Sequence, residues 1–138
     1  MSSILKVNTL TGVSTAGSIA VTGEGNSTTT NLQQGLAKAT GNVNQTSTQA
    51  ILTSFNVSTL TDVAVSESKL TFTNNMGDAD FSYAFGTREN NSANGEQYLT
   101  TKSANANTTS TVSAHSAGFN ATLEDVASAS MTVFGDLA

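Results

Sequence analysis

The chain lacks three residue types that often shape a small fold: its 138 residues include no cysteine, no proline and no tryptophan. Without cysteine there is no disulfide, no thiolate nucleophile and no Cys-ligated zinc site. Stability must therefore come from packing or from association with other chains. Small β domains with few charges often bury surface between identical subunits, so we expect a homo-oligomer.

Charged residues are also scarce. They make up 11% of the chain, against about 25% in an ordinary globular protein. The formal net charge is -5, and the five basic residues are scattered along the sequence: Lys6, Lys38, Lys69, Arg88 and Lys102. Nucleic-acid phosphates are bound by clustered Lys and Arg, so we expect no nucleic-acid partner.

Long hydrophobic runs are missing as well. The longest runs, such as Ala50-Ile51-Leu52, have the size of a strand, far short of the roughly 20 apolar residues of a membrane span. Lys6 and Asn8 interrupt the apolar start directly after Ile4-Leu5, so no signal peptide is predicted. We expect no membrane partner.

The chain is instead rich in Ser, Thr and Asn, which together make up roughly 40% of it. Short runs of alternating apolar and polar residues, separated by Gly, Asn and Ser, predict strands. The clearest runs cover residues 51–57, 69–73, 81–86, 111–114, 119–123 and 131–134. Short helices are compatible with the pattern only around 32–39 and 123–129. We predict an all-β chain with a small antiparallel, jelly-roll-like β-sandwich.

An apolar segment precedes this module. Residues 1–25 contain two strand-like runs bounded by glycines, and such a pair is marginal in water unless a sheet, a helix or another chain covers it. The segment therefore predicts a partner surface. We interpret residues 1–23 as an anchor, 24–35 as a linker and 36–138 as the sandwich domain. The apolar residues expected to form the anchor are Ile4, Leu5, Val7, Leu10, Ile19 and Val21.

Two loops carry no assigned role. The dipeptide Asn94-Gly95 is typical of a hairpin turn or an exposed loop, because both residues tolerate positive φ. Residues 103–110 are rich in Thr and Asn and form either an edge strand or a loop at the tip of the module.

His115 is the only histidine, so a Ser-His-Asp relay would have to use it. The nearest partners in sequence are Ser113, Ser116, Asp125 and Asp136, but no Gly-x-Ser-x-Gly motif supports a nucleophile. We interpret His115 as an ordinary strand residue and expect no catalytic residues. A small hydrolase centred on His115 is therefore kept only as the last of three hypotheses for the function.

Metal and cofactor sites are not indicated either. Asp78-Ala79-Asp80 lacks the spacing of an EF-hand loop and is better interpreted as a solvated turn. Gly23-Glu24-Gly25 lacks the lysine, the third glycine and the helix of a phosphate-binding loop. The aromatic row Phe81, Tyr83 and Phe85 is expected to be core rather than a platform for sugar rings.

The sequence resembles virion structural proteins of marine tailed phages, the cyanophage-like tail-fibre family. The resemblance covers roughly residues 1–85 and is carried by four stretches: Met1-Ser2-Ser3-Ile4-Leu5-Lys6-Val7-Asn8-Thr9-Leu10, Gln34-Gly35-Leu36-Ala37-Lys38-Ala39, residues 54–62 and residues 70–81. It implies a protein of the virion surface, assembled in the host cytoplasm and commonly a homotrimer, with the N-terminal segment docked on capsid or tail subunits. No catalytic residues or cofactors are implied.

Our first hypothesis is therefore a non-enzymatic short fibre, spike or decoration subunit, with a module that projects from the particle and is open to contact with a host-surface glycan. The alternative is a glycan-binding module of an adhesin, with Tyr83 and Tyr98 as the aromatic residues to test.

Overall fold

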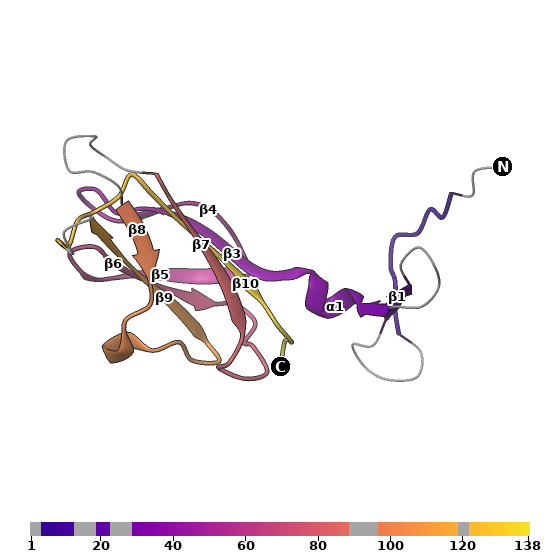
Figure 1. Ribbon diagram of the computed structural model, residues 1–138. Helices are drawn as coiled ribbons and strands as arrows, with labels where there is room; N and C mark the ends of the chain where they lie inside the picture. The colour runs from indigo at the N-terminus through magenta and orange to yellow at the C-terminus, as the bar shows by residue number, and fades with distance from the viewer. Residues whose placement is uncertain (1–3, 13–18, 23–28, 89–96, 119–121) are drawn as a thin grey trace. The chain divides into compact units, whose positions relative to one another are not determined.

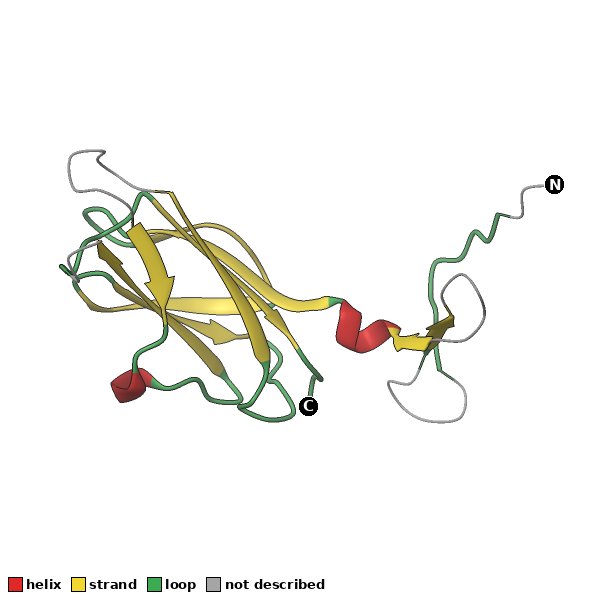
Figure 2. Cartoon of the chain, viewed as in Figure 1, coloured by secondary structure: helices red, strands yellow, loops and turns green. Residues whose placement is uncertain are grey.

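The computed structural model describes residues 4–12, 19–22, 29–88, 97–118 and 122–138. Figures 1 and 2 show the path of the chain and its secondary structure. The chain divides into two compact units, Met1–Leu36 and Ala37–Ala138.

The described residues of the N-terminal unit form one small sheet and a single helical turn. Strands β1 (Ala20–Thr22) and β2 (Thr29–Asn31) pair antiparallel, and helix α1 (Leu32–Gly35) follows directly. The range expected to be a linker thus contains β2 and α1. Residues 4–12, which are all described, belong to no helix or strand.

The second unit is a β-sandwich of two four-stranded sheets, visible as two layers in Figure 1. The order in one sheet is β4-β3-β10-β7 and in the other β5-β6-β9-β8, and all neighbours are antiparallel. The strands are β3 (Ala37–Asn44), β4 (Ala50–Phe55), β5 (Val57–Ala64), β6 (Glu67–Phe72), β7 (Ser82–Arg88), β8 (Gln97–Thr100), β9 (Thr111–Gly118) and β10 (Ser128–Phe134). The prediction of an all-β antiparallel sandwich is confirmed, whereas jelly-roll connectivity is not established by this order.

The core lies between the two sheets and follows the period-2 alternation of the strands. In β10, Ala129, Met131 and Val133 are buried while the residues between them are partly exposed. Leu70 of β6 and Val112 of β9 face them from the other sheet and belong to the same apolar cluster.

The predicted strand 51–57 is divided in the structure, because the chain changes sheets at Asn56. Strand β4 ends at Phe55 in one sheet, and β5 begins at Val57 in the other. Asn56 sits between them with φ 54°, a left-handed conformation that Asn adopts more readily than most residues. In the sequence, bulky and small residues keep alternating through Asn56. The pattern therefore did not show that the chain turns a corner here, from one sheet to the other.

The loops and helices also differ in part from expectation. Residues 103–110 form a loop rather than a strand, with a 3-10 turn at Ser103–Asn105. The helix compatible with 32–39 is reduced to α1, and the described residues 122–129 are not helical. The dipeptide Asn94-Gly95 lies outside the described residues.

Candidate attachment segment and polar clusters

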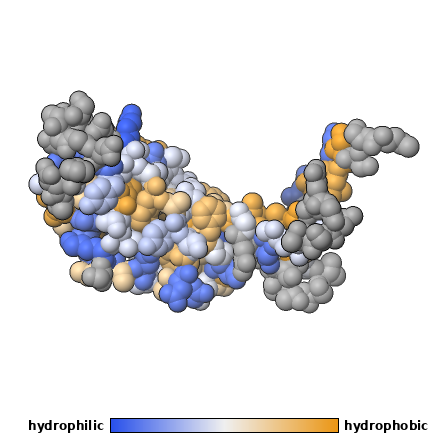
Figure 3. All heavy atoms as spheres, viewed as in Figure 1, coloured by the Kyte–Doolittle hydropathy of each residue, from blue (hydrophilic) through white to orange (hydrophobic). Residues whose placement is uncertain are grey.

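The anchor residues lie almost uncovered in the N-terminal unit. Ile4 and Leu5 are 77% and 79% exposed, Val7 and Leu10 about half exposed, and Val21 49%; Ile19 is partly buried. No described residue of this unit belongs to the buried apolar core. In Figure 3 orange, hydrophobic atoms accordingly reach the surface of its coloured part. An apolar segment without cover of its own is suited to docking on another surface.

A second group of exposed apolar side chains lies on β4 and next to it. Leu52 is 54% exposed and Phe55 60% exposed. Phe55 also lines a shallow cavity of about 330 Å³ at the end of the sandwich. The other lining residues of this cavity are Ala37, Lys38, Asn56, Thr73, Asn74 and Leu137.

His115 lies on β9 opposite Glu67 of β6, but the described residues assemble no relay around it. The Nδ1 atom of His115 and the Oγ atom of Ser113 are buried and have no hydrogen-bond partner in the described part of the chain. Ser116 lies on the opposite face of the strand, where its hydroxyl donates to Gln45 Oε1 at 2.8 Å. Asp125 accepts a hydrogen bond from the backbone of another residue, Ser66 N, at 2.7 Å, and Asp136 is exposed.

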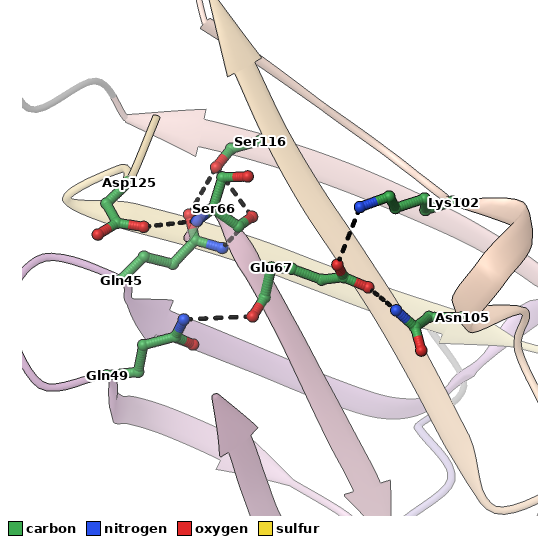
Figure 4. Close-up of polar contacts among 8 residues, drawn as sticks. All are labelled: Gln45, Gln49, Ser66, Glu67, Lys102, Asn105, Ser116 and Asp125. Atoms are coloured by element: carbon green, nitrogen blue, oxygen red, sulfur yellow. Dashed lines mark hydrogen bonds and ion pairs between the residues drawn. The ribbon is translucent and has the colours of Figure 1, made fainter. Parts of the chain in front are cut away.

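Glu67 fastens the β8–β9 loop to the outer face of its sheet. One carboxylate oxygen pairs with Lys102 Nζ at 3.4 Å, and the other accepts a hydrogen bond from Asn105 Nδ2. The Glu67 side chain is 3% exposed, whereas that of Lys102 is 43% exposed. Figure 4 shows both loop residues reaching toward this one carboxylate. Lys102 balances the negative charge of the buried Glu67 carboxylate. We therefore interpret Glu67, Lys102 and Asn105 as a structural clamp that holds the loop in place.

A second polar cluster lies inside one end of the sandwich and is built around Gln45. This fully buried side chain donates to Ser66 O and Ser68 Oγ, both at 3.0 Å. Its oxygen accepts from Ser116 Oγ and from Val126 N at 3.2 Å. The amide thus joins segments from both sheets (Figure 4), and a buried amide whose hydrogen bonds are all made favours a single packing arrangement.

The acidic pair Asp78 and Asp80 forms a local turn, as expected. Asp80 N donates to Asp78 Oδ1 at 2.9 Å, and both residues are exposed. Within the described ranges, no group of three His, Cys, Asp or Glu side chains is placed to hold a metal ion.

The aromatic row is core at its ends and exposed in the middle. Phe81 is buried and Phe85 packs against the core. Tyr83 is 42% exposed, stacks on Phe85 at 4.7 Å between ring centroids, and lies within 3.3 Å of Thr101 Oγ1. Tyr98 of β8 is 48% exposed, on the face opposite to that of its core-packed neighbour Leu99.

Several structurally important residues gave no sequence signal. Gln45 and Glu67 are polar residues in a chain full of polar residues, and only tertiary contacts distinguish them. Asn56 offered one weak signal, because Asn in the middle of an apolar strand run is unfavourable for a strand and tolerates positive φ.

The described part of the chain contains no helix that is both long and apolar enough to cross a membrane.

Comparison with known proteins gives no family for this chain: no family model, no curated protein and no solved structure matches it.

Proposed function

We propose that this protein is a non-enzymatic structural component of a phage virion, a short fibre, spike or decoration subunit. Its N-terminal segment docks on another virion subunit, and its β-sandwich projects from the particle surface. The observation that carries the proposal is the uncovered apolar segment: Ile4, Leu5 and Val7 are more than half exposed and precede a module that has its own complete core.

Two further features support assembly as the mode of action. The motifs in residues 1–10 and 70–81 resemble those of cyanophage-like fibre proteins. Among the described residues, His115 Nδ1 has no hydrogen-bond partner, whereas a hydrolytic relay requires an acidic residue at that atom. We further propose that the assembled form is a homotrimer, as in the proteins that the sequence resembles.

The test is incorporation into particles. A chain without residues 1–23 and a chain with Ile4→Ser, Leu5→Ser and Val7→Ser should both fold and fail to join particles when produced with the other virion proteins. Val65→Ser, at a residue that is 63% exposed on the sandwich, is the matched control and should be incorporated normally. Normal copy number of the truncated chain in purified particles would contradict the anchor.

A glycan-binding module remains the second candidate because Tyr98 is exposed on the sheet face, where aromatic rings can stack on sugars. Binding of the isolated chain to a glycan array, lost in Tyr98→Ala and retained in Tyr83→Ala, would support this function. Absence of binding at millimolar glycan concentration would exclude the glycan-binding function.

A further inference from the structure

The four edge strands of the sandwich differ in how they are protected from pairing with other chains. Charges, short length and irregularities are the usual protections of an edge strand. Strand β5 carries Asp62, β7 carries Arg88, and β8 has only four residues. Strand β4 has six residues, Ala50–Phe55, none of them charged. It is therefore the one strand of the four that has neither a charge nor a short length, and its irregularity is a shift in register that leaves Leu52 unpaired on β3.

Strand β4 also displays apolar side chains where an added strand would lie. Among the described strands it pairs only with β3, so its other side is a free edge there. All its residues except Ile51 are exposed, including Leu52 and Phe55. Apolar exposure along a free edge is what a strand-addition site requires.

The chain also contains a segment with the complementary properties. Residues 4–10 form no strand, and their large apolar side chains are exposed. Seven residues in extended form span about 23 Å, close to the roughly 20 Å of the six residues of β4. In extended form Leu5 and Val7 share one face, and Ile4 and Leu10 share the other, so apolar contacts form on both sides of the sheet.

We propose that residues 4–10 of one copy add as a strand to the free edge of β4 in a second copy. This inference rests on the proposed function, because it names the subunit on which the N-terminal segment docks. The occupant is a second copy because each chain supplies one uncovered segment and one uncovered edge, so the two occur in equal numbers in an assembly of identical subunits. The single charge of the segment, that of Lys6, meets no like charge on β4.

The absence of cysteine allows a direct cross-linking test on the full chain. Two single variants are mixed and oxidised, one with Lys6→Cys, Val7→Cys or Asn8→Cys in the segment and one with Thr53→Cys on β4. If residues 4–10 lie along the whole of β4, one of these three positions faces Thr53 in either strand direction, and facing residues come within disulfide distance. The matched control is Thr59→Cys, an exposed threonine on edge strand β5. For at least one of the three positions we expect at least about tenfold more of the mixed disulfide with Thr53→Cys than with Thr59→Cys, since pairing raises the local concentration; equal yields at all three would overturn the proposal.

Measurement of molecular mass provides a second readout. Sedimentation of the unmodified chain should show self-association that Val7→Lys and Thr53→Lys both weaken, whereas Thr59→Lys leaves it unchanged. A double variant with Val7→Cys and Thr53→Cys that forms its disulfide within a monomer would overturn the proposal, because the segment would then pair with its own copy.

The outcomes separate this inference from the function on which it rests. If cross-linking matches the control while removal of residues 1–23 still prevents incorporation into particles, the segment docks on a different virion protein. The proposed function then stands, and pairing between copies is wrong. If incorporation is also independent of residues 1–23, both are wrong.

Discussion

Asn56 shows how a single residue directs the chain from one sheet to the other. Its side-chain amide donates to Lys38 O and Asn74 O, both at 3.0 Å, and its oxygen accepts from Asn74 N at 2.7 Å. The residue therefore joins β3 of one sheet to the segment after β6 of the other, while adopting φ 54°. The corner depends on both the backbone conformation and the amide group.

We predict that Asn56→Ala lowers the free energy of unfolding by roughly 3 kcal/mol, because it loses these hydrogen bonds and strains the backbone. Asn56→Gly should cost less, about 1–2 kcal/mol, since glycine tolerates the conformation and loses only the hydrogen bonds. Urea denaturation of the two variants measures both values.

Ser47→Ala is the matched control for the backbone contribution. Ser47 also has a positive φ, 63°, but lies exposed in the β3–β4 loop. An effect of Asn56→Ala no larger than that of Ser47→Ala would show that the amide contacts at the corner do not stabilise the fold.

At the scale of the element, the β8–β9 loop depends on one acidic residue for its position. Glu67 is nearly inaccessible, and both of its carboxylate oxygens contact this loop, at Lys102 and Asn105. Ser113 N also donates to Asn107 Oδ1 at 3.1 Å. These contacts tie the loop to both β6 and β9.

Removal of Lys102 should therefore loosen the loop. Lys102→Met leaves the Glu67 carboxylate buried with half of its partners, so we expect a loss of roughly 1–3 kcal/mol and faster amide hydrogen exchange over residues 101–109.

The double variant with Glu67→Gln and Lys102→Met tests the charge itself. It should be more stable than Lys102→Met alone, because it buries a neutral amide in place of an unpaired carboxylate. Lys69→Met, on the same strand as Glu67, is the control for loss of a lysine. If Lys102→Met leaves both stability and exchange unchanged, the clamp has no stabilising role.

At the scale of the whole molecule, the apolar core belongs to one unit alone. Every residue of the buried cluster lies between Ala39 and Val133, within the sandwich. The described part of the N-terminal unit contributes none, and its sheet consists of two three-residue strands. A pair of strands this short is not stable by itself in water.

We therefore predict that residues 37–138 fold without the rest of the chain. At concentrations where both are monomeric, this fragment and the full chain should unfold cooperatively within about 2–3 °C of each other, which is less than a change of 1 kcal/mol produces at this size. Residues 1–36 alone should show no cooperative transition by circular dichroism. A fragment 37–138 that fails to unfold cooperatively would refute the independence of the module.

Part of the fold could be predicted because its cause is local. Strands at 69–73, 81–86, 111–114 and 131–134 were visible as alternation, since one face of each sheet is buried and the period-2 pattern records it. The corner at Asn56 and the clamp at Glu67 could not be predicted, because they depend on partners 18 to 38 residues away. In a sequence so rich in polar residues, a buried Gln or Glu cannot be distinguished from an exposed one by pattern.

The sequence by itself determined the class of the molecule: all-β, without disulfides, poor in charge, with an apolar segment ahead of the module. These properties follow from composition and side-chain alternation, which act residue by residue. Only the tertiary structure decided which strands are neighbours, which edges stay free and which apolar residues stay uncovered. Exposure of Leu52 and Phe55 on β4 is a consequence of the order β4-β3-β10-β7, and strand order arises from long-range pairing that local pattern does not encode.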